Sequence, residues 1–560
     1  MFKKTNMKFS IIIFCALLGC AGKTPKPRYP SKQAYAGFVG GLLWHLRGEP
    51  NEALEYALEA IKHDPESAYL KVFAARIFLY LQKYHQAVSL LKQAAQKRPG
   101  LPDIYLVSGM VEMMQRRFEK AKASLQKASD RAPKWKEPYW AMARLHRIDD
   151  CFECEARSYK KLLEINSEDS EALIALASLQ RRNGRIEKAK QHLLKLVKSL
   201  PWYGRAFVEL AYISNTRGEI FHAVRFFQKA LDVEDDDLST AEIFWRFYLI
   251  HGKRKQAEEL LQKLSIHGSP LYRTFLAEKY LEQGMVKEAK KAVQEALQMD
   301  SHFVEAIVMK VRLMLLRGEF EKAEALALKT AEKNIIDSED RTALIEALVD
   351  IYLRWEKCKR GQKKIQAIIS NQSLAHQTAL IYFQSRCRNE VSQLAEFKKK
   401  VADQGLDEES LYKLAFVLDA AGKSKEAEKA AEKILIISPD NVQALNFLGF
   451  SWAERGVMLD KSLKFLTRAH SLRPMDPAIM DSLGWVHFKR GDLKKATKYL
   501  ERALRVLPNE PELLYHMGRI QEKRNLLEDA EYTYQKALQY RPDFRIKKSI
   551  RRRLKKWEKK

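Results

Sequence analysis

The amino-acid sequence predicts an all-α protein, a superhelical solenoid of about fifteen helix pairs that ends in a C-terminal capping helix. Leu, Ala, Lys, Glu and Arg dominate its 560 residues, while glycine and proline are few, which favours helices over sheets. The same residue types return every 34 positions along most of the chain, as expected for a repeat architecture. With 46% apolar residues, stacked repeats can bury a continuous core.

Residues 1–19 have the organisation of a secretory signal peptide. Three lysines precede an apolar stretch from Phe9 to Leu18, which is too short to cross a bilayer as a helix because that needs about 20 residues. The stretch ends in Leu17-Leu18-Gly19-Cys20, which resembles the lipobox of bacterial lipoproteins. The resemblance implies cleavage before Cys20 and attachment of lipid to Cys20. The alternative is an ordinary signal peptide that is cut nearby.

Residues 20–33 are expected to form the lipidated N-terminus and an extended linker, since they are rich in Pro, Lys and Arg. Ala21 and Gly22 follow the cysteine, and lipoproteins without Asp at this place usually travel to the outer membrane. We therefore expect a lipid-anchored protein of the outer membrane that contacts the membrane through Cys20. The periplasmic face is favoured over the cell surface.

The repeat is clearest near the C-terminus, where five positions recur after 34 residues. Gly484, Ala496, Leu500, Ala503 and Pro508 are followed by Gly518, Ala530, Tyr534, Ala537 and Pro542. This ladder resembles the tetratricopeptide repeat, in which small residues let two antiparallel helices cross closely. Proline ends the second helix because it lacks an N–H and clashes with the preceding turn. One repeat cannot bury its own apolar faces, so neighbouring repeats must stack.

The ladder divides the chain into an N-terminal array at 34–337, a weak stretch at 338–407 and a C-terminal array at 408–542. The weak stretch keeps a helical apolar period but loses the small residues, so it is interpreted as degenerate helix pairs or as a hinge. Parts of the last third, at 444–456 and 481–485, are similar to proteobacterial outer-membrane lipoproteins with these repeats.

Residues 543–560 are expected to form a basic amphipathic capping helix on the last repeat, with Ile546, Ile550, Leu554 and Trp557 as its apolar stripe. The other face is basic, with Lys547, Lys548, Arg551, Arg552, Arg553, Lys555, Lys556, Lys559 and Lys560. This face is either solvated or a contact for anionic lipid or an acidic polymer. The export signal argues against nucleic acid as the partner.

Four cysteines remain in the body of the chain. Cys151 and Cys154 form a C-x-x-C in a predicted turn between helices, outside the strand–helix context of a redox motif, and His146 alone does not complete a zinc site. Free thiols are the favoured interpretation, with a local disulfide as the alternative. Cys358 and Cys387 lie at comparable turns of adjacent weak units, where a disulfide would clamp them.

The sequence contains no nucleophile, phosphate-loop or zinc-protease motif, so it predicts no enzyme, cofactor or metal. The repeat resemblance implies a concave groove lined by the first helix of each pair, with positions five and nine facing it. In the last three units these positions are Asn446, Phe450, Asp481, Trp485, Tyr515 and Arg519. Trp485 and Phe450 are either exposed anchors for a partner or partly buried between helices.

The predicted fold and the expected location in the outer membrane together favour a lipid-anchored scaffold for a bacterial envelope assembly. Such an assembly is a pilus, secretion, polysaccharide-export or motility machine. Envelope proteins are the expected partners of the groove. The alternative is an envelope subunit that binds cell-wall or lipopolysaccharide polymer through its basic surface, since the net charge is +28.

Overall fold

The computed structural model describes residues 31–233, 237–264, 268–332, 337–369, 373–387, 393–540, 542 and 544–557. The predicted signal peptide and Cys20 lie outside the described residues. So do Lys559 and Lys560. Within the described part, no helix combines the length and the apolar character that crossing a bilayer would require.

The described residues form 31 helices, and the first thirty make fifteen consecutive antiparallel pairs, which confirms the predicted fold class. The first helices of the pairs are α1 (Lys32–Leu46), α3 (Ala68–Tyr80), α5 (Pro102–Met114), α7 (Lys136–Ile148), α9 (Ser170–Arg182), α11 (Gly204–Thr216), α13 (Leu238–Ile250), α15 (Pro270–Glu282), α17 (Val304–Arg317), α19 (Ser338–Trp355), α21 (Leu374–Arg386), α23 (Glu408–Ala420), α25 (Val442–Arg455), α27 (Pro477–Lys489) and α29 (Pro511–Lys523).

The second helices of the pairs are α2 (Pro50–His63), α4 (Tyr84–Lys97), α6 (Phe118–Arg131), α8 (Phe152–Ile165), α10 (Ile186–Ser199), α12 (Ile220–Val233), α14 (Arg254–Leu264), α16 (Val286–Met299), α18 (Phe320–Ala331), α20 (Cys358–Ile368), α22 (Leu394–Gln404), α24 (Ser424–Ile437), α26 (Leu459–Leu472), α28 (Leu493–Val506) and α30 (Leu527–Gln539). The last helix, α31 (Phe544–Trp557), has no partner after it. The first helix begins two residues before the expected boundary at 34.

Close helix crossings explain the small residues of the ladder. A Cβ atom built on Gly484 would lie 1.8 Å from Leu500 Cδ2, and one built on Gly518 would lie 2.5 Å from Tyr534 Cε1. Both neighbours are fully buried in the interface between the paired helices. Glycine is therefore required here by the approach of the partner helix.

Replacing Gly484 with Ala is expected to lower the free energy of unfolding by about 1–3 kcal/mol, because Leu500 must leave its packed position. Urea unfolding of the purified protein measures the effect. Gly100 is the matched control, since a Cβ atom there would meet nothing within 4 Å. Gly100→Ala should change stability by less than about 0.5 kcal/mol, and equal effects at both sites would contradict the packing explanation.

The weak stretch forms two helix pairs, α19 with α20 and α21 with α22. The first helices remain stacked through it, since α17 contacts α19, α19 contacts α21 and α21 contacts α23. A disulfide joins Cys358, the first residue of α20, to Cys387, which follows α21. The stack of repeats therefore continues through 338–407, and the missing small residues do not interrupt it.

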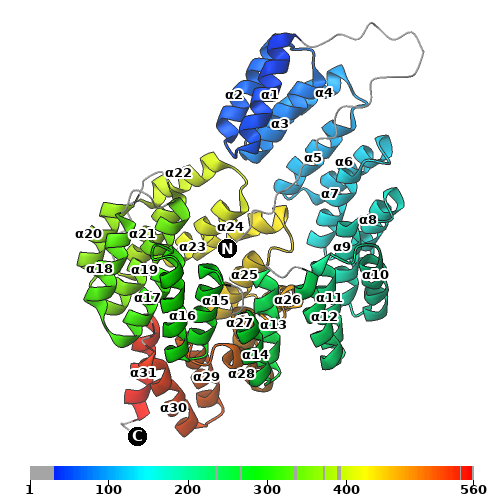
Figure 1. Cartoon of the computed structure of the whole chain (residues 1–560). Coiled ribbons are helices and arrows are strands. Elements are labelled where there is room, and N and C mark those ends of the chain that lie inside the picture. Colours follow the sequence, from blue (N-terminus) through cyan, green and yellow to red (C-terminus); the bar gives the residue numbers. More distant parts are fainter. Residues whose placement is uncertain are drawn as a thin grey trace.

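The superhelix packs against itself (Figure 1). Helices α22, α24 and α28 contact α2, α5, α7 and α13, which lie more than 200 residues earlier in the chain. We call this contact between residues 403–509 and residues 51–284 the inter-turn interface. Polar contacts run along it: Asn51 Nδ2 to Asp403 O (3.1 Å), Arg116 Nη2 to Glu432 Oε2 (2.6 Å), Arg505 Nη1 to Ile250 O (2.9 Å) and Gln283 Nε2 to Val506 O (2.6 Å).

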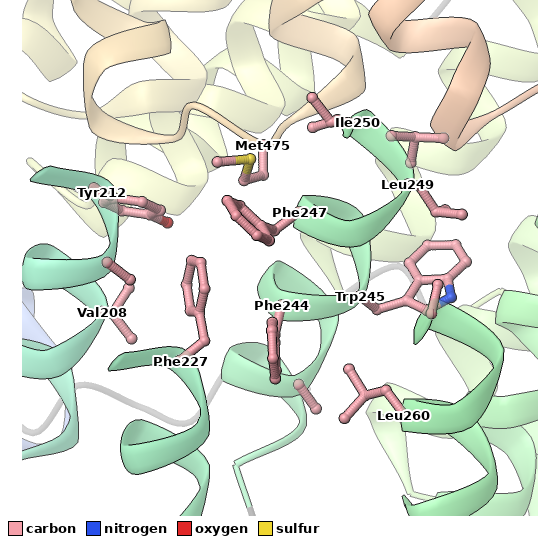
Figure 2. Packing of buried hydrophobic residues seen from close by; sticks show 14 of the residues in the cluster. Val208, Tyr212, Phe227, Phe244, Trp245, Phe247, Leu249, Ile250, Leu260 and Met475 are labelled. Carbon is pink, nitrogen blue, oxygen red and sulfur yellow. The ribbon is translucent and has the colours of Figure 1, made fainter. Parts of the chain in front are cut away.

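The inter-turn interface also has an apolar part. One buried cluster holds Phe244 and Phe247 of α13 together with Met475, Ala503 and Val506 of the late repeats. Figure 2 shows Met475 over Phe247, at the border between the two parts of the chain. The core is therefore shared between turns of the superhelix and does not run only from one repeat to the next.

The C-terminal helix α31 lies on the last pair. Ile550 is buried against Leu514, Tyr534 and Ala537 of α29 and α30, with Ile546, Leu554 and Trp557 packed around it. These are the four residues of the predicted apolar stripe. Lys547 Nζ also binds Glu356 Oε1 at 2.7 Å, beside the end of α19, so the last helix reaches back to the middle of the chain.

Candidate partner-binding surface

The six predicted groove residues lie in three consecutive first helices: Asn446 and Phe450 in α25, Asp481 and Trp485 in α27, Tyr515 and Arg519 in α29. These helices contact one another, α25 with α27 and α27 with α29. We call the side of the first helices that carries these positions the inner face. Of the six side chains, Trp485 and Asp481 are buried and the other four are half-buried.

Trp485 is only 1% exposed, so the interpretation as an exposed anchor is wrong and burial between helices is what the structure shows. Its ring stacks on His516 with 4.1 Å between ring centroids and on Phe488 with 4.8 Å. The indole Nε1 donates to Glu454 Oε2 at 2.5 Å. The repeat pattern placed Trp485 at position nine of its unit, on the inner face of α27. It could not show that the rings of His516 and Phe488 cover the indole.

Asp481 is paired with His516, a residue that the sequence analysis did not single out. His516 Nδ1 and Asp481 Oδ1 are 2.7 Å apart, and both residues are buried. Burial by itself lowers the pKa of His516, but the carboxylate of Asp481 reverses this and holds the pKa above its ordinary value. Asp481 therefore fixes α29 to α27 and is not available to a partner.

Arg519 and Tyr515 remain half-exposed on the inner face. Arg519 Nη1 donates to the Tyr515 hydroxyl at 3.1 Å, and its guanidinium lies 5.8 Å from the centre of the Trp485 ring. The Tyr515 hydroxyl also contacts Ser549 Oγ of α31 at 3.0 Å. Aromatic faces, the hydrogen bond to Tyr515 and the carboxylate of Glu522, whose Oε2 lies 3.8 Å from Arg519 Nε, hold the guanidinium in place.

A more accessible part of the inner face lies in the weak repeats and in α23, the first helix of the C-terminal array. Tyr382 and Phe416 stack with 5.1 Å between ring centroids, and the Arg386 guanidinium lies 5.1 Å from the Tyr382 ring. Phe416 occupies position nine of its unit, the position of Trp485 four helices later, and is 38% exposed. Here an aromatic side chain at the groove position does meet solvent.

An open cavity of about 700 Å³ lies at the starts of α19, α21 and α23. Its lining is polar and carries both signs of charge, with Arg341, Thr342, His376, Asp407, Glu409 and Lys413 among the residues. The small-residue ladder did not predict this cavity, because the repeats of α19 and α21 lack the ladder that the C-terminal units show. The departure of these repeats from the repeat pattern is the one feature of the sequence that could have indicated the cavity.

Both internal cysteine pairs are joined as disulfides. Free thiols had been favoured for Cys151 and Cys154, so the structure supports the alternative. Cys151 is the N-cap residue of α8 and Cys154 lies in its first turn, so the motif opens a helix and does not lie wholly in a turn. Because the bonded sulfurs close a loop of only a few residues, this disulfide stabilises little beyond that turn.

A family model for the tetratricopeptide repeat matches residues 78–145, 280–334 and 487–552. The matched segments make up about a third of the chain, and there the sequence is similar to tetratricopeptide repeats. Repeats of this family generally serve as protein-interaction scaffolds and not as catalysts. A curated relative, the TPR repeat-containing protein PA4667 of Pseudomonas aeruginosa, is 34% identical over 83 residues, which is 15% of this chain and 14% of the relative. The chain thus matches only a small part of that relative's length.

Three solved structures are similar to this chain at 16% sequence identity, each with a TM-score below 0.5. The complex titled Naa15/Naa10 bound to HypK-THB covers 90% of this chain and 76% of its own, with a TM-score of 0.27. YrrB, described as a tetratricopeptide-repeat protein with an unusual peptide-binding site, covers 33% and 96% with a TM-score of 0.28. The pilF protein of Pseudomonas aeruginosa covers 38% and 96% with a TM-score of 0.31.

Proposed function

We propose that this tetratricopeptide-repeat protein is a lipid-anchored scaffold of a bacterial envelope complex, and that its partner binds the inner face of α19, α21 and α23. The lipobox-like Leu17–Cys20 supports the lipid anchor, and Ala21-Gly22 after the cysteine supports location in the outer membrane. The pilus, secretion, polysaccharide-export and motility machines are the assemblies in which such a scaffold would serve.

The observation that carries the proposal is the exposed inner face of α19, α21 and α23. It combines an open cavity with the exposed ring of Phe416, and Arg386 lies over the ring of Tyr382, which stacks on Phe416. Aromatic residues and arginine contribute most to the affinity of protein interfaces when a partner covers them. In the C-terminal units Trp485, Asp481 and Arg519 make internal contacts, so the site is proposed at 338–416 and not at 446–519.

Site-specific photocrosslinking in intact envelopes tests this assignment. A photoreactive residue at Phe416 or Thr342 should give discrete crosslinked products, and Arg386→Glu should weaken them at least about tenfold. Trp202 is the matched control, because it is an exposed aromatic residue far along the chain from the inner face of the weak repeats. Equal products from positions 416 and 202, or none from either inner position, would refute the proposed site.

The lipid anchor is tested separately. Labelled palmitate should enter the wild-type protein and be absent from Cys20→Ser. Loss of the crosslinked products in Cys20→Ser, with the fold intact by circular dichroism, would show that the anchor brings scaffold and partner together. Equal labelling of both proteins would exclude the anchor at Cys20.

A second candidate function is binding of an acidic envelope polymer. The described part of α31 contains no acidic residue and exposes Arg545, Lys548, Arg551, Arg552, Lys555 and Lys556. Raising salt from about 0.1 M to about 1 M shortens the Debye length from about 10 Å to about 3 Å, so polymer binding should fall at least tenfold. Binding of lipopolysaccharide that survives high salt, or that persists when four of these residues become Gln, would contradict this candidate.

A further inference from the structure

The N-terminal end of the solenoid has an apolar outer face. In α1 the side chains of Tyr35, Leu42, Leu43 and Leu46 are exposed, with exposed fractions from 37% to 63%. Their spacing places them along one side of the helix, and Val39 lies half-buried between them. The opposite side, with Ala34, Gly37 and Gly41, is buried against α2 and α3. Helix α1 is therefore apolar on both sides, but other described residues cover it on only one.

This departs from what the end of a solenoid requires. Terminal repeats normally present a polar outer face, because no neighbour covers them. The other end follows that rule, since α31 exposes a row of basic side chains. A helix that is apolar all round is normally buried on all sides. The exposed stripe of α1 thus indicates a second surface that covers it.

We propose that the exposed stripe of α1 lies on the surface of the phospholipid bilayer. The proposal extends the proposed lipid anchor. Ser31, the N-cap residue of α1, lies eleven positions after Cys20, a distance of at most about 40 Å for extended chain. A chain held by lipid at Cys20 therefore keeps α1 beside the bilayer at a high effective concentration.

The charges and the side-chain types in and before α1 fit a bilayer surface as the cover of the exposed stripe. Residues 21–31 carry Lys23, Lys26 and Arg28 and no acid, and α1 itself contains no Asp or Glu. Basic residues next to a membrane are attracted to anionic headgroups, and leucine with tyrosine or tryptophan is the composition of helices that lie in the interface. Exposed acids in this repeat lie on α2, so α1 is the side that faces the bilayer.

The test uses residues 21–560, which contain every described residue but no acylated cysteine. This protein should co-sediment with vesicles of phosphatidylethanolamine and phosphatidylglycerol, and the triple variant Leu42→Gln/Leu43→Gln/Leu46→Gln should bind at least about tenfold more weakly. The matched control is Trp202→Gln/Phe221→Gln/Tyr532→Gln, which removes three exposed rings from other repeats. The control should bind within about twofold of the wild type.

A second measurement separates binding from folding. A polarity-sensitive dye on Leu46→Cys should be quenched by brominated lipid, whereas the same dye on Trp202→Cys should not. Failure of the wild type to bind vesicles, or equal binding by the triple variant, would overturn the proposal. A wild-type dimer that the triple variant dissociates, without vesicle binding, would assign the stripe to a second copy instead. Palmitate labelling reports on the anchor independently, so failure of one idea is distinguishable from failure of the other.

Discussion

Replacing Trp485 with Ala is expected to lower the free energy of unfolding by about 3–5 kcal/mol, the range for removing a buried aromatic ring. The ring is 1% exposed and lies between His516 and Phe488. Its removal leaves a cavity between α27 and α29 and frees Glu454 from the indole N–H. Local hydrogen exchange or urea unfolding of the C-terminal repeats measures the loss.

The exposed residue Trp202 is the matched control, and Trp202→Ala should change stability by less than about 0.5 kcal/mol. Trp485→Phe should fall between the two, because it keeps the stacking but loses the hydrogen bond to Glu454. A Trp485→Ala protein that is as stable as the wild type but binds its partner more weakly would restore Trp485 as a contact residue. Affinity measurements must therefore be made at a temperature where the variant is fully folded.

Asp440→Ala is expected to lower the free energy of unfolding by about 3 kcal/mol, because it leaves three arginines without their shared carboxylate. Asp440 Oδ2 accepts from Arg147 Nη1 at 2.5 Å, and Oδ1 accepts from Arg182 Nη1 at 3.0 Å and from Arg468 Nε at 2.8 Å. Arg147 and Arg182 belong to early repeats and Arg468 to a late one. The carboxylate therefore joins the two sides of the inter-turn interface.

The variant should also expand the molecule. With only Glu155 left beside Arg147 and Arg182, the mutual repulsion of the three arginines opposes the inter-turn interface. Small-angle scattering should report a larger radius of gyration than for the wild type. Asp460→Ala is the control, since Asp460 also pairs with an arginine but its side chain is 94% exposed. An unchanged radius in Asp440→Ala would show that the apolar part of the interface suffices.

Lowering the pH should weaken the same contact between Asp440 and its three arginines. Burial by itself raises the pKa of Asp440, but the three arginines outweigh it and lower the pKa to about 2. Because this lies below the value of about 4 for an unfolded Asp, the stabilising contribution is complete above about pH 5 and is lost as the pH falls toward 2. The stability difference between wild type and Asp440→Ala should shrink over that interval. A difference independent of pH would contradict an ionised Asp440.

Sequence patterns among nearby residues predicted the repeat, but they did not predict the candidate partner-binding site. The ladder through Gly484, Leu500 and Pro508 predicted where each helix pair begins and ends, because helix crossings and helix termination depend on nearby residues. The same rules placed Trp485 and Phe416 at equivalent positions. Whether each ring meets solvent depends on its neighbours, and these differ: His516 and Phe488 cover Trp485, while Phe416 keeps an open side.

The sequence by itself determined that this protein is an array of about fifteen helix pairs with a basic terminal helix, since these features rest on a 34-residue period and on local helix patterns. Only the tertiary structure decided that distant repeats meet, with Asp440 between Arg147 and Arg182. A repeat pattern describes contacts between neighbours, and the small rotation from each repeat to the next sets where the turns meet. The same rotation, added up over many repeats, leaves the inner face of α19, α21 and α23 and the outer side of α1 without a cover among the described residues.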